Sequence, residues 1–222
     1  MSDNLYVNGT IIAISGKARS GKDTVAALIE KILLGTSRTP VIVPFAQCLK
    51  DVAAKTFGLD RHKLDVDPAY KAEHRRMLVE YGQAIRSFAP TAWVDYVCRE
   101  AMKSEIAMPE EKFVWIIPDL RFGNEIDRLE EVSGGCCVAV RVNASEKTRR
   151  GRMGAESWAR YEADAKDDPS ETELDFVAYR GVFSWYVQND STSDDLERQV
   201  RRFLQCYVDS GIEIAPPLAV AA

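Results

Sequence analysis

The sequence predicts an α/β protein of three layers, in which helices cover both faces of a mainly parallel sheet. Short apolar runs alternate with helical patterns, and the first run leads directly into a glycine-rich turn and a helix. Strands that are separated by helices pair in parallel, and ligands of such sheets bind at the carboxyl ends of the strands. The predicted strands are residues 11–15, 41–45, 112–117, 136–142 and 182–187.

Composition predicts one domain over residues 1–222, because 222 residues with 46% hydrophobic side chains can form one sizeable core. A net charge of −5 argues against broad binding to nucleic acid or to an anionic membrane. No apolar run reaches the length of a membrane span, and residues 1–9 lack the pattern of a signal peptide. We therefore expect a cytoplasmic protein, and its five cysteines, which form no CxxC pair, are expected to be reduced thiols.

The turn after the first strand has the spacing of a Walker A loop. Two glycines five residues apart let backbone N–H groups surround an anion, and the helix from about Asp23 to Leu34 directs its positive end to the same point. Lys22 adds a full charge that reaches the outer phosphates. A turn of this kind that binds no ligand is the alternative. The predicted nucleotide-binding residues are Gly16, Lys17, Ala18, Arg19, Ser20, Gly21, Lys22, Asp23 and Thr24.

The metal position of this loop departs from the usual pattern. Asp23 stands where Ser or Thr normally follows the lysine, and Thr24 comes one residue later. Either Asp23 or Thr24 is expected near Mg²⁺, directly or through water.

A second motif follows the strand 112–117, in the run Asp119-Leu120-Arg121-Phe122-Gly123-Asn124-Glu125. An aspartate at the end of an apolar strand beside a phosphate loop suits a Walker B site that holds Mg²⁺, so Asp119 is the third predicted metal residue. Arg121 is expected to meet a phosphate. The alternative is a strand-to-helix turn in which Asn124 or Glu125 caps the helix 124–132.

Three further helical patterns, at residues 47–57, 68–88 and 93–106, interrupt the simple alternation of strands and helices. Residues 145–175 are polar, with basic side chains first and acidic ones after them, which suits a mobile flap that closes on phosphates. The chain ends in a polar turn at residues 190–195, a helix over 196–208 and an apolar tail after Ile212 that we expect to be disordered.

Together these residues resemble the phage deoxynucleoside monophosphate kinases. The resemblance implies the P-loop nucleoside monophosphate kinase fold, with a helical acceptor-binding region at about residues 60–108, a lid at about 145–175, and ATP as phosphoryl donor. The run Gly82-Gln83-Ala84 departs from the family pattern in the acceptor region. The matching segments are GKARSGKDTVA (16–26), FAQCLK (45–50), YGQAIRSFAPTAWV (81–94), DLRFGNEID (119–127), PSETELD (169–175) and NDSTSDDLERQV (189–200).

Phosphoryl transfer needs cations aimed at the transferring group from several sides. The alternative for the basic residues of the flap is a solvated helix face. A phosphate acceptor is largely ionised at pH 7 and needs no general base, whereas a hydroxyl acceptor would use Asp119 or Asp23 as base. The predicted catalytic residues are Lys22, Asp119, Arg121, Arg149, Arg150 and Arg152.

For the acceptor we expect Arg86 to grip a phosphate and Tyr81 and Trp93 to stack on a base, with core packing as the alternative for the two aromatic residues. Lys50, Asn124 and Glu125, which lie in the matching segments, complete the predicted acceptor site.

The leading hypothesis is therefore an ATP- and Mg²⁺-dependent kinase of deoxynucleoside monophosphates for phage DNA synthesis, located in the host cytoplasm. The alternative is a P-loop kinase of a hydroxyl group, such as 5-hydroxymethyluracil in phage DNA, or of a small metabolite. A nucleotide-binding regulator without catalysis is the third hypothesis, and the basic flap argues against it. The expected partners are small nucleotides, with a homodimer left open and no nucleic acid or membrane.

Overall fold

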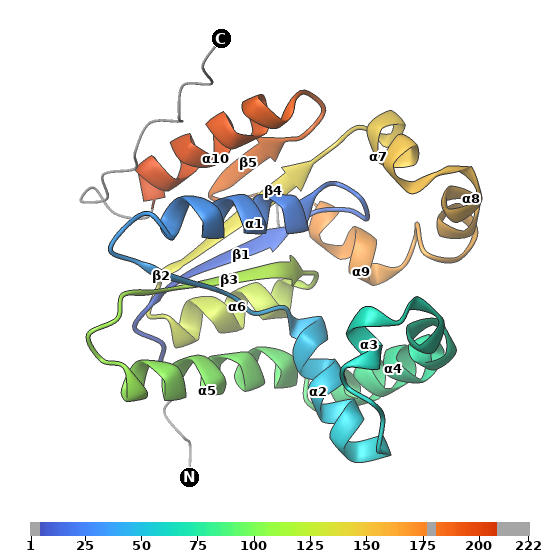
Figure 1. The fold of residues 1–222 in the computed structure, drawn as a ribbon, viewed down its shortest axis with the longest axis horizontal. Helices are drawn as coiled ribbons and strands as arrows, with labels where there is room; N and C mark the ends of the chain where they lie inside the picture. The colour runs from blue at the N-terminus through green and yellow to red at the C-terminus, as the bar shows by residue number, and fades with distance from the viewer. Residues whose placement is uncertain (1–4, 177–180, 208–222) are drawn as a thin grey trace.

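The computed structural model describes residues 5–176 and 181–207 and contains a five-stranded sheet, all of whose neighbouring strands are parallel (Figure 1). The strand order is β2-β3-β1-β4-β5, so β1 lies at the centre and carries the glycine-rich turn at its carboxyl end. The strands are β1 (Thr10–Ser15), β2 (Thr39–Ile42), β3 (Phe113–Leu120), β4 (Cys137–Asn143) and β5 (Trp185–Gln188).

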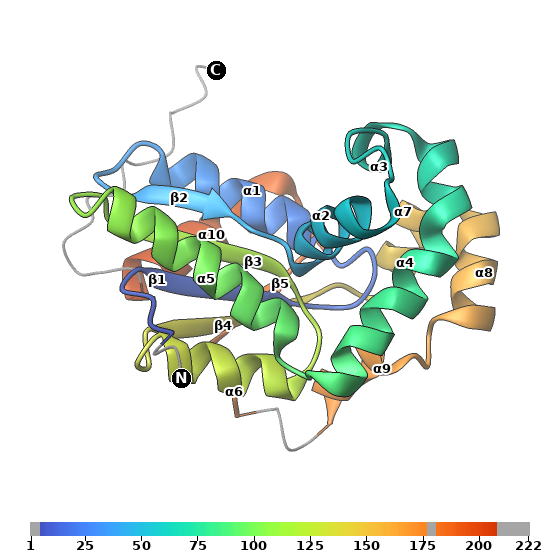
Figure 2. The same ribbon diagram turned by 90° about the horizontal axis from the view of Figure 1, so that it is seen from below.

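Helices cover both faces of this sheet, which confirms the three-layer prediction. Figure 2 shows α5 (Ala92–Ala107) and α6 (Gly123–Val132) in front of the sheet, and α1 (Lys22–Leu33) and α10 (Ser193–Tyr207) behind it. Side chains of β1 alternate between the two cores, as the two-residue period of a strand requires. Ile11 packs with α5 and α6, whereas Ile12 packs with α1 and α10.

Two helical lobes lie beyond the carboxyl ends of the strands (Figure 1). The first consists of α2 (Phe45–Phe57), α3 (Lys63–Val66) and α4 (Pro68–Phe88). We call it the acceptor lobe because it overlaps the acceptor-binding region expected at about residues 60–108, whose role stays a prediction. The side chain of Asp67 begins α4 by accepting N–H bonds from Ala69 and Tyr70, and Pro68 takes the first helical position, where a missing N–H costs nothing.

The second lobe is the lid segment, residues 145–175, which is helical where the sequence showed only a polar flap; its mobility stays a prediction. It forms α7 (Glu146–Met153), α8 (Ala155–Asp164), α9 (Pro169–Thr172) and a 3₁₀ turn, η1 (Glu173–Asp175). Trp158 and Tyr161 are 2% and 9% exposed, so these two aromatic residues give the lobe its own small core.

Three predicted strands have clearly shifted boundaries. The strand expected over residues 112–117 is β3 at Phe113–Leu120, so Asp119 lies within the strand instead of after it. The strand expected over residues 41–45 is β2 at Thr39–Ile42, because Phe45 already begins α2, whose first N–H groups bond to Asp119. The strand expected over 182–187 is β5 at Trp185–Gln188. The expectations for residues 1–4, for Val208 and for the tail after Ile212 fall outside the described residues. Within the described ranges, no helix has both the length and the apolar character that a membrane span requires.

Candidate active site

The glycine-rich turn approaches its neighbours so closely that its glycines are required. A Cβ on Gly16 would lie 2.4 Å from the carbonyl oxygen of Val142, and one on Gly21 would lie 2.1 Å from Nδ2 of Asn189. Gly21 also has a φ of +98°, in the left-handed region that favours glycine. Arg19 adopts a positive φ of 62° without being glycine, which is the kind of local strain found at ligand-binding turns. The turn is therefore held against the ends of both β4 and β5.

Lys22 points back into this turn. Its Nζ donates to the carbonyl oxygens of Gly16 at 2.7 Å and Lys17 at 3.2 Å, and the residue is 8% exposed. Burial, together with the positive charge of Arg121, lowers the pKa of the ammonium to about 8. The charges of Glu171, Asp23 and Asp119 oppose this lowering of the pKa, and a bound anion would oppose it further.

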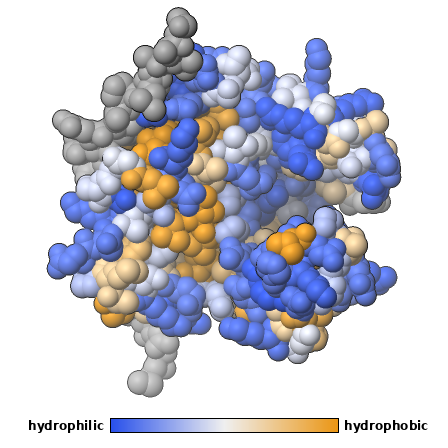
Figure 3. Space-filling view, viewed as in Figure 1, coloured by the Kyte–Doolittle hydropathy of each residue, from blue (hydrophilic) through white to orange (hydrophobic). Residues whose placement is uncertain are grey.

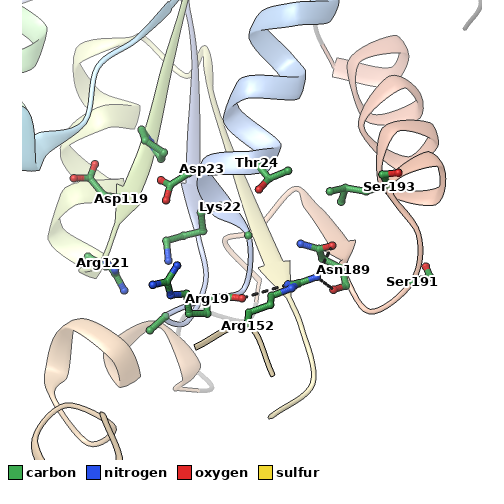
Figure 4. Close-up of a pocket in the computed structure, with 14 residues that line it drawn as sticks. Arg19, Lys22, Asp23, Thr24, Asp119, Arg121, Arg152, Asn189, Ser191 and Ser193 are labelled. Carbon is green, nitrogen blue, oxygen red and sulfur yellow. Dashed lines mark hydrogen bonds between the residues drawn. The ribbon is translucent and has the colours of Figure 1, made fainter. Parts of the chain in front are cut away.

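A cavity of about 630 Å³ opens in front of the turn. Figure 3 shows a recess between the two helical lobes, and Figure 4 shows the side chains at the cavity, with Lys22, Arg19 and Arg121 directed toward one another. The hydroxyl of Ser20, in the same turn, is buried and has no hydrogen-bond partner among the described residues. The lining residues are Ala18, Arg19, Gly21, Lys22, Asp23, Thr24, Pro118, Asp119, Arg121, Arg152, Asn189, Ser191, Ser193 and Leu196.

Asp119 reaches the cavity, but its carboxylate has a structural task that the sequence did not reveal. Its two oxygens accept the N–H groups of Phe45 at 2.9 Å and Ala46 at 2.8 Å, at the beginning of α2. Burial raises the pKa of this carboxyl group, and these two bonds and the charge of Arg121 oppose the rise. Asp119 therefore joins the end of β3 to the acceptor lobe, and its contact with a metal stays a prediction.

The other two predicted metal residues, Asp23 and Thr24, are exposed in the first turn of α1 and line the same cavity. No cluster of three or more His, Cys, Asp or Glu side chains that could hold a metal ion occurs within residues 5–176 and 181–207. A cation here would have few protein ligands, as is usual for Mg²⁺ that arrives with phosphates.

Arg121 lies at the cavity, as predicted, and is held there by a residue that sequence analysis did not single out. Its Nη1 donates to Oε1 of Glu171 at 2.7 Å and to the carbonyl oxygen of Ser170 at 3.2 Å. The other oxygen of Glu171 accepts the backbone N–H of Ala18 at 2.7 Å. The only sequence signal for Glu171 was the alternation of acidic residues at positions 171, 173 and 175.

The three lid arginines divide into two groups. Nη1 of Arg149 lies 3.5 Å from the carbonyl oxygen of Ala18, and Arg152 donates to the carbonyl oxygens of Arg19 and Ser20, both at 3.3 Å. Arg150 is exposed on α7 and does not line the cavity. The structure thus brings Arg149 and Arg152 to the glycine-rich turn. It leaves Arg150 on the solvated face of α7, as the alternative for the basic residues of the flap predicts.

The predicted acceptor residues Arg86 and Glu125 form an ion pair with each other, and a phosphate contact of the remaining Arg86 donors stays a prediction. Nη1 of Arg86 donates to Oε1 of Glu125 at 2.7 Å, and the Glu125 side chain is 1% exposed. Its Oε2 accepts the N–H groups of Arg121 and Phe122, at 2.8 Å and 3.0 Å. Burial raises the pKa of Glu125, and Arg86 opposes the rise. Glu125 caps α6, which was the alternative reading of this motif.

The remaining predicted acceptor residues also have partners within the protein, and their contact with an acceptor stays a prediction. Trp93 is 6% exposed and belongs to the core between the sheet and α5, which argues against its stacking on a base. Tyr81 packs edge-on against Phe57, with ring centroids 5.1 Å apart. Lys50 pairs with Asp65, and Asn124 donates to the carbonyl oxygen of Pro90 at 2.9 Å. Core packing thus accounts for the position of Trp93, and contacts within the acceptor lobe account for those of Tyr81 and Lys50. Asn124 is held by the turn between α4 and α5.

The parallel sheet, the glycine-rich strand-to-helix turn and the buried lysine define a P-loop kinase. The family model described as phosphomevalonate kinase matches residues 14–134, more than half of the chain. The chain belongs to this family. A phosphomevalonate kinase of Drosophila melanogaster is 28% identical over 185 residues, which cover 83% of this chain and 90% of the relative.

Solved structures of other kinases are also similar to the chain. The Mycobacterium tuberculosis APS kinase, in complex with AMPPNP and APS, has a TM-score of 0.47 and 13% identity, covering 91% of this chain and 99% of that one. The Acinetobacter baumannii shikimate kinase, in complex with shikimate, has a TM-score of 0.44 and 10% identity, covering 91% of this chain and 95% of that one.

The family match overturns the expected deoxynucleoside monophosphate kinase function. The segments that suggested phage kinases include the phosphate loop and the turn after β3, which serve any phosphoryl transfer and carry little information on the acceptor. Burial of Trp93 in the core argues against its stacking on a base, whereas Tyr81 is half-buried and its acceptor role stays a prediction. The alternative of a small-metabolite kinase agrees better with the family.

We expect Lys22→Ala to lower kcat/KM by at least about 10²-fold, because the ammonium acts on the phosphates during transfer. Thermal unfolding should change little, since the lost contacts are offset by the removal of a buried charge. Steady-state kinetics and calorimetry check both statements. Lys31→Ala, an exposed lysine at the end of the same helix, is the control and should be neutral. If Lys22→Ala retained its turnover, the glycine-rich turn would not be the phosphate-binding loop of a kinase.

Nucleotide affinity should depend on the protonation of Lys22. Phosphates bind the ammonium form, and its pKa in the free protein is about 8. The affinity for ADP should therefore be flat below that pKa and fall by up to about tenfold per pH unit above it. Isothermal titration between about pH 7 and pH 9.5 tests this. Lys22→Arg, which stays protonated, should abolish the dependence, and an unchanged profile in that variant would show that another group titrates.

Arg86→Ala should destabilise the fold by about 3 kcal/mol, because it leaves the carboxylate of Glu125 buried without its cation. Denaturant unfolding measures this loss, and a further Glu125→Gln change should recover part of it. Arg76→Ala on the same helix is the matched control, since the Arg76–Glu80 pair is exposed and its loss should leave the free energy of unfolding unchanged. If the stability of Arg86→Ala is unchanged and only the KM for the acceptor rises, then Arg86 binds the acceptor and does not stabilise the fold.

Proposed function

We propose that this protein transfers the γ-phosphoryl group of ATP to a phosphorylated small metabolite, with phosphomevalonate as the first candidate. The family match over residues 14–134 and the name of the Drosophila relative support this acceptor. The cavity beside the P-loop, with lysine and arginine side chains at its wall, supports the transfer of an anionic group.

The engagement of Asp119 is the observation that carries the choice of a phosphate acceptor. A hydroxyl acceptor benefits from a carboxylate that takes its proton. Both oxygens of Asp119 already accept N–H bonds from α2, so this task would fall to Asp23, which is exposed at the cavity in the first turn of α1. The second pKa of a phosphate monoester is about 6, so such an acceptor is largely ionised at pH 7 and needs no base. A phosphomonoester therefore suits this site better than an alcohol.

ATP fits the residues of the turn. Apart from the N–H groups of Ala18 and Ser20, which bond to Glu171 and Lys17, the backbone N–H groups of the turn are the donors that a polyphosphate would need, together with the unpartnered hydroxyl of Ser20 and the ammonium of Lys22. Mg²⁺ fits with Asp23 or Thr24 as its protein ligand, because their oxygens lie in the first turn of α1 at the same cavity. When bound, Mg²⁺ neutralises charge on the outer phosphates.

The protein's own groups then stabilise the transferring phosphoryl from two sides. Its transition state is loose and spreads negative charge over three equatorial oxygens, so cations held in fixed positions contribute most. Lys22 approaches from the P-loop, and Arg121 approaches from the end of β3. Arg152 stabilises the loop itself, since its donors are engaged by the carbonyl oxygens of Arg19, Ser20 and Asn189.

A panel of acceptors tests the proposal. Purified protein is mixed with Mg-ATP and phosphomevalonate, mevalonate, or each deoxynucleoside monophosphate, and ADP formation is followed by a coupled assay. We expect phosphomevalonate to be phosphorylated with kcat/KM at least about 10²-fold above that for the unphosphorylated alcohol, because binding groups for the missing phosphate would be left unpaired. ADP formation with mevalonate but not with phosphomevalonate would exclude a phosphate acceptor.

A further inference from the structure

We propose that Glu171 is a positioning residue for phosphoryl transfer, which fixes the guanidinium of Arg121 and links that position to the seating of the lid segment. This inference rests on the kinase activity but not on the identity of the acceptor. Glu171 belongs to α9, and its carboxylate contacts Arg121 and the P-loop backbone at the same time.

The carboxylate of Glu171 is buried among polar partners. Its side chain is 8% exposed, its Oε1 binds Nη1 of Arg121 at 2.7 Å, and its Oε2 accepts the N–H of Ala18 at 2.7 Å. The hydroxyl of Tyr161, from α8, lies 3.3 Å from the same Oε2. One carboxylate thus joins the end of β3, the P-loop and two lid helices.

The geometry leaves Arg121 available for a phosphate. Arg121 and Ala18 both line the cavity, whereas Glu171 approaches them from the lid segment and uses only Nη1 of the guanidinium. An arginine has further donors in the same plane, so the bound carboxylate orients the group without exhausting it. A guanidinium that is free to rotate would have to be ordered during each turnover, at a cost in rate.

Neighbouring acidic residues hold the segment that carries Glu171. Glu173 accepts the N–H of Gly123 at 2.8 Å, at the start of α6, and Asp175 pairs with Lys17 at 2.8 Å and with Arg141. Alternate residues of this short run are therefore anchored to the end of β3, the P-loop, the start of α6 and β4. Arg121 takes its observed position only when this run is seated, so lid seating and arginine orientation are coupled.

The test compares Glu171→Gln with Glu173→Gln, a matched control in the same run whose carboxylate contacts an N–H group and no arginine that the structure describes. Glutamine keeps the shape of Glu171 but presents either one acceptor or an N–H donor to Arg121. We expect kcat to fall about tenfold or more in Glu171→Gln, with the KM for ATP changed less than about twofold. Glu173→Gln should keep both values within about twofold of the parent.

A second background separates positioning from a general structural role. In Arg121→Lys protein the guanidinium is gone, so adding Glu171→Gln should change kcat by less than about twofold. An equal fall in kcat with Arg121 and with Lys at position 121 would overturn the proposal. A higher kcat or tighter ATP binding in Glu171→Gln would also overturn it, because Glu171 would then inhibit the reaction. If phosphomevalonate proves not to be the acceptor, the slow hydrolysis of Mg-ATP gives the same comparison, so the two proposals fail separately.

Discussion

Positive charge gathered at the carboxyl ends of the strands is the constraint on which the rest of the site depends. Burial lowers the pKa of Lys22 and of Arg141, and Arg121 adds to the repulsion at both. Such an arrangement persists without a ligand only if carboxylates are brought close. Glu171 and Asp175 provide them from one short run of the lid segment, which explains why residues expected to form a loose flap contact the core.

In and after the last residues of β3, carboxylate side chains bond to backbone N–H groups at the beginnings of helices. Asp119 begins α2, and Glu125 begins α6 while it pairs with Arg86 of α4. A carboxylate at a helix N-terminus is stabilised by the free N–H groups and by the helix dipole. The contacts of Asp119 and Glu125 attach the acceptor lobe to the end of β3, directly before Arg121. The position of the acceptor lobe relative to the P-loop therefore depends on these two carboxylates.

Much of the fold could be predicted because its signals are local. The period of apolar residues located each strand of the sheet, and the spacing of Gly16 and Gly21 with Lys22 located the phosphate loop. The errors at β2 and β5 come from short segments whose ends depend on which neighbour their backbone groups meet. Helices α7 and α8 were missed because charged sequences show little apolar period. Within α8, Trp158 and Tyr161 nevertheless pack against each other and against Arg149 of α7.

By itself the sequence determined the parallel α/β fold and the P-loop, since their signals come from residues that are close together in the chain. Arg121 could be placed beside the P-loop because ligands of a parallel sheet bind at the carboxyl ends of its strands. Only the tertiary structure decided what the other polar residues do. Arg121 and Glu171 are 50 positions apart, and Arg86 and Glu125 are 39 apart. A charged side chain acts on a ligand or on the fold according to the partner that packing brings within about 3 Å, and that partner is a property of the whole folded chain.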